Sequence, residues 1–188
     1  MRIVAGKHRG RVIVAPKGHS TRPTADRTRQ ALFNVLEHAA WSPGLAGARV
    51  IDLFAGSGAF GLEALSRGAA FALFIDTDPA ALAAIEENIA GLRVEAFCDV
   101  RRADAGRLAA SAAAPFDLAF LDPPYDKGLV EPALRGLASG DWLADGAIAI
   151  VEQGANEPAP VSADYEVLDN RTWGAARVWF LRYRDRAA

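Results

Sequence analysis

The stretch that decides the fold covers residues 50–69 and reads VIDLFAGSGAFGLEALSRGA. Its apolar beginning predicts a short buried strand. Gly56, Gly58 and Gly61 follow, and from Leu62 onward the apolar residues recur at helical spacing. A strand, a glycine turn and a helix in this order form a binding unit for nucleotide-like ligands, because glycines let the backbone approach a ligand over the helix N-terminus.

One acidic residue in this stretch bears on the choice of ligand. The spacing Gly-x-Gly-x-x-Gly also fits the dinucleotide fingerprint, so by itself it admits NAD. Asp52, however, lies near the end of the predicted strand, four positions before Gly56. A carboxylate there should repel a pyrophosphate and suit a cationic ligand such as a sulfonium. We therefore favour S-adenosylmethionine (SAM) over NAD, and a turn that binds no ligand remains the plain alternative.

Length and composition indicate one soluble domain with at most a small appendage. The chain has 188 residues, of which 51% are hydrophobic, and this suffices for a substantial core. A single cysteine excludes an internal disulfide and a cysteine-based metal cluster. No apolar run approaches the roughly 20 residues of a membrane span, and charges interrupt any signal-peptide core. We expect a cytoplasmic protein with no membrane partner and no metal, and a monomer by default.

Charge is unevenly distributed along the chain. The first 30 residues contain eight Lys or Arg side chains and a single acidic residue, although the whole chain has a net charge of −2. A basic segment on an acidic domain predicts an arm that binds a polyanion, and a merely solvated terminus is the alternative. The side chains expected to contact a nucleic-acid backbone are Lys7, Arg9, Arg11, Arg22 and Arg27.

The N-terminal segment is predicted to form a separate extension. Residues 2–15 alternate as two short strands around a basic turn at residues 7–10, which is typical of a β-hairpin. Thr24 can cap the helix that follows. We therefore divide the chain into a basic β-hairpin extension, residues 1–20, and a main domain, residues 21–188.

The remaining pattern alternates strands with helices. Predicted strands cover residues 71–75, 94–97, 116–121 and 147–151, predicted helices cover 79–90, 105–114 and 129–137, and residues 167–168 and 178–183 form a closing hairpin. This alternation indicates an α/β fold with a doubly wound, mostly parallel sheet and an antiparallel finish. Ligands of such sheets bind beyond the carboxyl ends of the strands, where Asp52, Asp76 and Asp122 all fall.

Two of the acidic side chains suit the nucleoside part of a ligand. Asp76 lies twenty positions after Gly56, where a carboxylate can accept hydrogen bonds from both ribose hydroxyls of either NAD or SAM. Asp104 follows the third predicted strand and could hydrogen-bond an adenine amino group. A solvated loop acid is the alternative for Asp104.

The motif Asp122-Pro123-Pro124-Tyr125 carries the chemistry. The lone pair of an exocyclic amine on a base is delocalised into the ring, so the amine is a poor nucleophile. An oxygen of Asp122 and the backbone carbonyl of Pro123 could each accept one N–H and direct the lone pair toward a methyl donor. Tyr125 offers a ring for stacking an extruded base, worth roughly 1–3 kcal/mol. A proline-rich loop with a packed tyrosine is the alternative.

These motifs resemble those of a known family. The residues Asp52-Leu-Phe-Ala-Gly-Ser-Gly58, with Asp122-Pro-Pro-Tyr125 downstream, resemble the class I SAM-dependent amino-methyltransferases. The run from Arg22 to Asn34, together with residues 61–69, is similar to the bacterial 16S ribosomal RNA guanine-N2 methyltransferases, which modify guanine 966 of the small subunit. The resemblance extends from Arg2 to Tyr183. It implies a Rossmann-like class I fold with a mostly parallel seven-stranded sheet whose last strand is antiparallel.

The resemblance also implies the role of each site residue. Asp52, Phe54, Gly56 and Gly58 would line the methionine part of SAM, Asp76 would hold the ribose, and Asp104 would approach the adenine. Asp122, Pro123 and Tyr125 would hold the target guanine, and Arg22, Thr24 and Arg27 would close over the cofactor or the RNA. The implied partner is 16S rRNA within the small subunit or an assembly intermediate.

Three other functions stay open. A DNA adenine-N6 methyltransferase could use the same acceptor motif, but 188 residues leave no room for a separate domain that reads duplex sequence. A dinucleotide-dependent oxidoreductase would need a proton-handling residue that has no convincing position here. An RNA-binding factor that has kept the fold without catalysis would bind RNA and not SAM.

Overall fold

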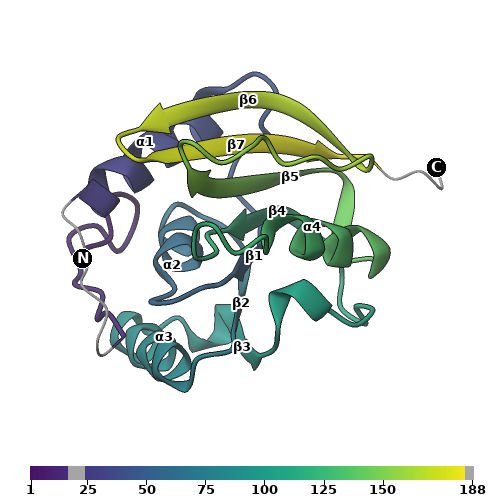
Figure 1. The fold of residues 1–188 in the computed structure, drawn as a ribbon. Helices are drawn as coiled ribbons and strands as arrows, with labels where there is room; N and C mark the ends of the chain where they lie inside the picture. Colours follow the sequence, from purple (N-terminus) through teal and green to yellow (C-terminus); the bar gives the residue numbers. More distant parts are fainter. Residues whose placement is uncertain (17–23, 185–188) are drawn as a thin grey trace.

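The computed structural model describes residues 1–16 and 24–184, without the side chains of residues 24 and 25. Its centre is a seven-stranded sheet in the order β3-β2-β1-β4-β5-β7-β6 (Figure 1). The strands are β1 Arg49–Leu53, β2 Phe71–Asp76, β3 Cys98–Arg102, β4 Phe116–Leu121, β5 Leu143–Gly154, β6 Tyr165–Trp173 and β7 Ala176–Tyr183. Neighbours pair in parallel from β3 to β5, and β7 is antiparallel to both β5 and β6. The predicted fold class is confirmed.

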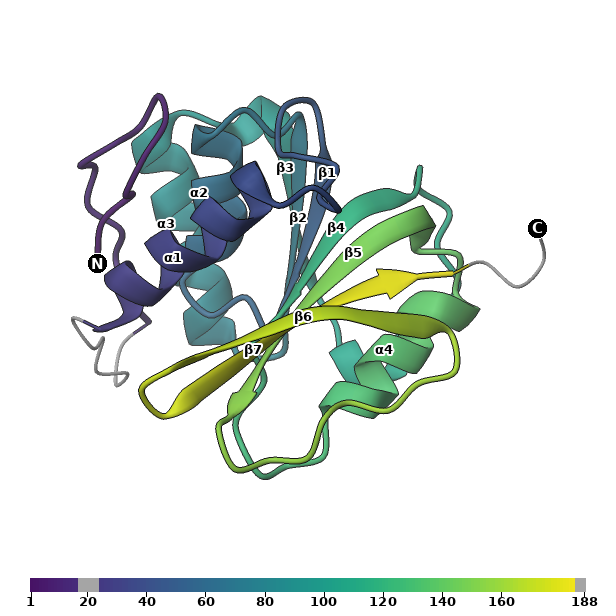
Figure 2. The ribbon, with the colours of Figure 1, turned by 90° about the horizontal axis from the view of Figure 1, so that it is seen from above.

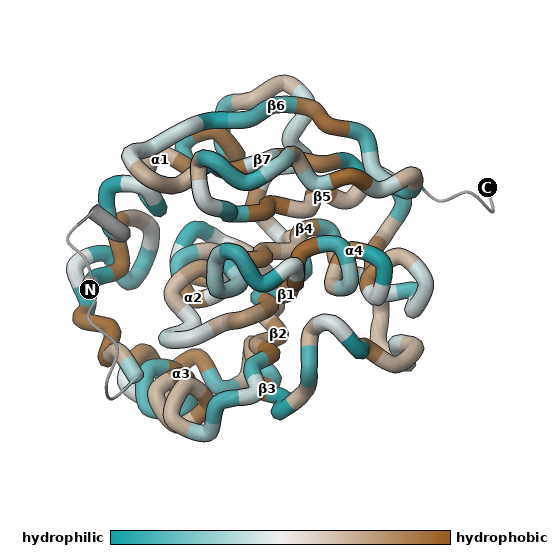
Figure 3. The backbone as a smooth tube through the Cα atoms, viewed as in Figure 1, coloured by the Kyte–Doolittle hydropathy of each residue, from teal (hydrophilic) through white to brown (hydrophobic). Residues whose placement is uncertain are grey.

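Helices cover both faces of the sheet (Figure 2). Helices α1 (Thr24–His38), α2 (Ala59–Ser66) and α3 (Pro79–Leu92) pack on one face, and α4 (Val130–Ser139) packs on the other. Alternate residues of each central strand belong to different core clusters, so that Val50 faces the first set of helices and Ile51 faces α4. Central strands buried on both faces are continuously apolar. Figure 3 shows hydrophobic residues gathered along them.

Two predicted elements are wrong. The third strand begins at Cys98, because residues 95–97 form a short 3₁₀ helix. Residues 105–114 do not form the predicted helix: only Ala105–Arg107 make a 3₁₀ turn. Alanine favours a helix, but Ala105 alone in this segment is buried, so a helix here would have little apolar face to pack. Instead the segment lies against α4 and the loop that follows it, where the carbonyl of Ala109 accepts a hydrogen bond from Trp142 Nε1 at 2.9 Å.

The predicted N-terminal hairpin is reduced to one antiparallel bridge between Arg2 and Val12. Its backbone closes with hydrogen bonds between residues 3 and 10 and between residues 3 and 11. Ile3 and Ile13 are buried in the same core cluster as α1, α2 and α3. The N-terminal segment therefore adds its apolar side chains to the core of the sheet. The proposed boundary between residues 20 and 21 falls outside the described residues.

A buried glutamate joins this segment to the helices. Glu63 of α2 is 0% exposed, and its carboxylate accepts hydrogen bonds from the backbone N–H groups of Val4 at 2.7 Å and Ala5 at 3.0 Å. Arg67 Nε donates to the same carboxylate at 2.8 Å, and Arg29 Nε lies 3.6 Å from it. Since a buried charge needs partners, Glu63 fixes the N-terminal segment against α1 and α2.

The turn between β1 and α2 depends on close packing at one glycine. Asp52 Oδ2 accepts a hydrogen bond from the backbone N–H of Gly61 at 2.9 Å. A Cβ atom on Gly61 would lie 2.3 Å from Cε1 of Phe74, which is closer than packed atoms can approach. Gly61 therefore lets α2 pack closely on β2, which is the role of the third glycine in the fingerprint.

We predict that Glu63→Ala lowers the free energy of unfolding by about 3–5 kcal/mol, because Arg29, Arg67 and two backbone N–H groups lose their acceptor. Urea denaturation followed by circular dichroism measures the change. Glu87→Ala, on the exposed side of α3, is the matched control and should change the stability by less than about 0.5 kcal/mol. Equal losses for the two variants would contradict the role of Glu63.

We predict that Gly61→Ala destabilises the protein by about 1–3 kcal/mol, because the Phe74 ring must move. Phe74→Leu makes room, so the double variant should lose less than the sum of the two single variants. Gly91→Ala on α3, where a Cβ meets nothing within 4 Å, should instead stabilise by up to about 1 kcal/mol. Strict additivity of Gly61→Ala and Phe74→Leu would show that the packing argument fails.

Candidate active site

Two adjoining cavities open at the carboxyl ends of the strands. The larger cavity, about 890 Å³, lies over the ends of β2 and β3, and the smaller cavity, about 460 Å³, lies between the ends of β4 and β5 and the β6–β7 turn. The residues that line both are Met1, Phe54, Gly56, Ser57, Asp122 and Tyr125. The glycine turn and the Asp-Pro-Pro-Tyr motif therefore form the common wall, as expected for the C-terminal edge of such a sheet.

The larger cavity brings together four of the predicted cofactor residues, Phe54, Gly56, Asp76 and Asp104. Asp76 holds the turn in shape, because Oδ2 accepts a hydrogen bond from the N–H of Gly56 at 2.8 Å and Oδ1 accepts one from the N–H of Asp78 at 2.9 Å. Each carboxylate oxygen can still accept another hydrogen bond. Asp104 caps a 3₁₀ turn through the N–H of Gly106 at 2.9 Å and borders the same cavity.

Gly56 is the glycine that leaves room for a ligand. Its φ of 55° lies in the left-handed region, and a Cβ atom there would meet only the carbonyl oxygen of Phe54, at 3.9 Å. A Cβ atom on Gly58, in contrast, would lie 3.2 Å from the Phe74 ring. Gly58 thus faces the core and lines neither cavity.

Asp52 lies beneath the turn, away from the cavity walls. It is 1% exposed, and burial raises the pKa of its carboxyl to about 8, with Asp76 adding to the increase and the Gly61 hydrogen bond opposing it. The group is therefore more easily protonated than an exposed aspartate. Its observed contact supports α2, and a contact with a ligand stays a prediction.

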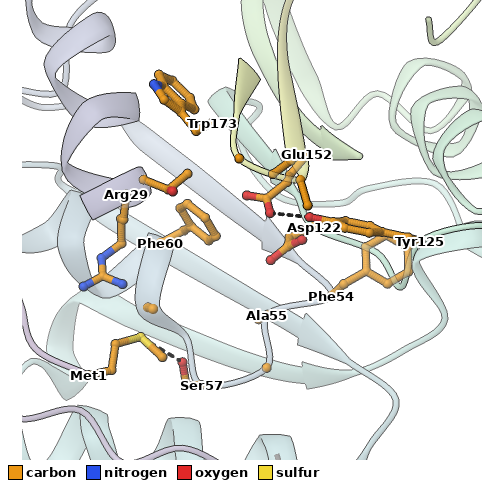
Figure 4. A pocket seen from close by; sticks show the side chains of 16 residues that line it. Met1, Arg29, Phe54, Ala55, Ser57, Phe60, Asp122, Tyr125, Glu152 and Trp173 are labelled. Carbon is orange, nitrogen blue, oxygen red and sulfur yellow. Dashed lines mark hydrogen bonds between the residues drawn. The ribbon is translucent and has the colours of Figure 1, made fainter. Parts of the chain in front are cut away.

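The smaller cavity contains two carboxyl groups on adjacent strands (Figure 4). Leu121 of β4 pairs with Val151 of β5, so Asp122 and Glu152 follow at equivalent positions. Tyr125 Oη donates a hydrogen bond to Glu152 Oε1 at 2.8 Å.

The surroundings of this pair raise the pKa of both carboxyls. Burial raises the pKa of Asp122 well above its ordinary value, and the carboxyls of Glu152 and Asp52 raise it further. Burial also raises the pKa of Glu152, while the hydrogen bond from Tyr125 lowers it. As carboxylates, these two groups are therefore stronger bases and stronger hydrogen-bond acceptors than exposed carboxylates.

Several wall residues were not predicted from the sequence. Glu152 was noted only as the end of a strand, and its register with Asp122 was the signal that could have identified it. Phe60 stacks on Phe120 with ring centroids 5.5 Å apart and borders the smaller cavity. Trp173 reaches the same cavity from the end of β6 (Figure 4).

Four of the predicted RNA-binding residues lie within the described part of the chain. Lys7, Arg9, Arg11 and Arg27 are exposed, and none of them lines either cavity. The ammonium of Lys7 lies 5.2 Å from the centroid of the Phe97 ring, and Arg11 Nη2 donates to the carbonyl of Gly91 at 2.6 Å. Arg22 and the side chain of Thr24 lie outside the described residues.

Two features are absent from the described part of the chain. Among residues 1–16 and 24–184, no group of three or more His, Cys, Asp or Glu side chains is arranged to hold a metal ion. Within the same ranges, none of the helices combines the length and apolar character needed to cross a membrane.

Comparison with known proteins gives close relatives. The family model described as "Conserved hypothetical protein 95" matches residues 1–182. The Escherichia coli K12 protein named "Ribosomal RNA small subunit methyltransferase D" is 39% identical over 160 residues, which cover 85% of this chain and 78% of that protein. The Bacillus subtilis protein named "Putative rRNA methyltransferase YlbH" is 32% identical over 188 residues, covering 98% and 100% of the two chains.

Solved structures agree with these matches. A putative methyltransferase from E. coli has a TM-score of 0.84 and 34% identity, with 99% of both chains covered. A putative methylase from Haemophilus influenzae has a TM-score of 0.79 and 27% identity, covering 97% of this chain and 98% of that one. The chain thus belongs to the family described as "Conserved hypothetical protein 95" and has the Rossmann-like fold of class I SAM-dependent methyltransferases.

Proposed function

We propose that this chain transfers a methyl group from SAM to the exocyclic N2 of a guanine in 16S rRNA of the small ribosomal subunit, guanine 966 by the family resemblance. The observation that carries the proposal is the position of Asp122 and Tyr125, on the wall that the two cavities share. A methyl donor in one cavity and an amine in the other would meet at this wall. The names of the E. coli and B. subtilis relatives support an rRNA substrate.

The larger cavity fits SAM. Its volume of about 890 Å³ suits a ligand of this size. Asp76 keeps acceptor capacity for the ribose hydroxyls, Gly56 leaves space above the turn, and Asp104 borders the place for the adenine. When bound there, SAM supplies an electrophilic methyl group on a sulfonium.

The Asp-Pro-Pro-Tyr motif would make the amine reactive. An oxygen of Asp122 and the backbone carbonyl of Pro123 each accept one N–H of the guanine amine, so the nitrogen lone pair points toward the methyl group. The new N–C bond would replace the S–C bond of the donor, whose electron pair would remain on sulfur. Asp122 then takes the proton that N2 loses, a role that suits a carboxyl whose pKa is raised by burial. Positioning of this kind can lower a barrier by several kcal/mol.

The remaining wall residues would hold the base. The rings of Phe54, Phe60 and Tyr125 border the smaller cavity, and a base extruded from RNA gains stacking energy on such rings. The exposed Lys7, Arg9, Arg11 and Arg27 would contact phosphates of the rRNA. A monomer acting in the cytoplasm on the small subunit, or on its assembly intermediate, completes the proposal.

We predict that Asp122→Ala lowers kcat by about 10²–10³-fold, because one acceptor of the amine and of its proton is lost. Asp122→Asn should retain more activity, since an amide oxygen still accepts an N–H. The measurement is transfer of labelled methyl groups from SAM to small subunits that lack the modification, with SAM binding followed by calorimetry. Both variants should bind SAM within about threefold of the unaltered protein, as expected for a group that acts in the transition state.

Asp126→Asn serves as the matched control, because this exposed aspartate follows the motif and should leave kcat unchanged. Undiminished turnover by Asp122→Ala would refute the acceptor mechanism. If the unaltered protein labels no RNA, the proposed function is wrong. Preferential labelling of duplex DNA would favour the adenine-N6 alternative.

A further inference from the structure

We propose that Glu152 selects guanine among the purines, by accepting the N1–H of the target base while Asp122 accepts from the neighbouring N2 amine. This assignment rests on the proposed function and deepens it, because it gives a residue that reads the identity of the base. Asp122 alone could accept a hydrogen bond from the amino group of more than one kind of base. A second acceptor in a fixed position distinguishes between them.

The backbone places the two carboxyls for this task. Asp122 and Glu152 follow the paired residues Leu121 and Val151 on adjacent parallel strands, which lie about 4.8 Å apart. Both side chains line the smaller cavity (Figure 4). Glu152 does not line the larger cavity. The Watson–Crick edge of guanine presents N1–H beside the N2 amine. Two acceptors side by side therefore match two donors side by side.

The surroundings of Glu152 leave its carboxyl able to accept a hydrogen bond from a ligand. Across residues 1–16 and 24–184, no Lys or Arg forms an ion pair with Glu152, although burial raises its pKa. Its hydrogen bond from Tyr125 Oη fixes the orientation of the carboxyl, and a carboxylate has acceptor capacity beyond that one bond. A half-buried carboxyl whose hydrogen-bond donor is a neutral hydroxyl gains stability when a further donor binds it.

Other purines lack the donor that Glu152 requires. Adenine and 2-aminopurine each carry a lone pair at N1, which a carboxylate oxygen would oppose. 2-Aminopurine is the informative probe, because it keeps the N2 amine that receives the methyl group. Sites built to hydrogen-bond a donor reject analogues that lack it far more strongly than apolar pockets do.

The test uses small subunits reconstituted with 16S rRNA that carries either guanine or 2-aminopurine at the target position. The full chain should methylate the guanine form with a kcat/KM at least about 100-fold higher. Glu152→Gln should reduce this ratio at least tenfold, because its amide can donate to the N1 lone pair while its oxygen accepts from Tyr125. SAM affinity, measured by calorimetry, should be unchanged.

Two further variants distinguish a role of Glu152 in base selection from a role in positioning Tyr125. Tyr125→Phe keeps the ring and removes the hydrogen bond to Glu152, so it should lower turnover on both substrates and largely keep their ratio. Glu87→Gln, an exposed glutamate on α3, should behave as the unaltered protein.

An unchanged ratio in Glu152→Gln, or an equal collapse of the ratio in Tyr125→Phe, would overturn the role of Glu152 and leave the proposed function standing. Failure of the unaltered protein to methylate guanine would overturn both. Glu152→Asp keeps a carboxylate and should keep the preference for guanine, so loss of the preference in this variant would also refute the inference.

Discussion

The hydrogen bond from the Gly56 N–H to Asp76 is the contact on which the site depends. It joins the turn after β1 to the end of β2, while Asp52 holds the N–H of Gly61 from below. Together they fix the floor of the larger cavity. Parallel pairing of Leu53 with Leu121 then places the Asp-Pro-Pro-Tyr motif at the same edge of the sheet. The two halves of the site are thus positioned by strand pairing together with the side-chain contacts that hold the glycine turn.

The central strands could be predicted because burial on both faces gives them a recognisable sequence pattern. Strands β1, β2 and β4 are buried on both faces, so they are short apolar runs between turn residues. The edge strand β3, with the sequence CDVRR, is half exposed and lacks such a run. For residues 105–114 the sequence predicted a helix that the structure lacks. The high helix propensity of alanine stabilises a helix in a protein only where an apolar face packs on the core.

The site could be predicted only in part, from the rule that ligands of parallel sheets bind beyond the carboxyl ends of the strands. The rule located Asp76 and Asp122 correctly at one edge, but it could not show that Asp52 turns under the helix or that Glu152 stands beside Asp122, since both depend on strand register and side-chain direction. Charge counts have the same limit. Arg29 was counted in the basic arm, yet it is 2% exposed and paired with Asp26 and Glu63.

The central claim is that the wall between the two cavities positions the N2 amine of one guanine next to a methyl donor. Mass spectrometry of 16S rRNA, after reaction of the protein with SAM and small subunits that lack the modification, tests it most directly. The account predicts a single added methyl group per subunit, on N2 of one guanine. A methyl group on an adenine, on a ring nitrogen or on a ribose would contradict it.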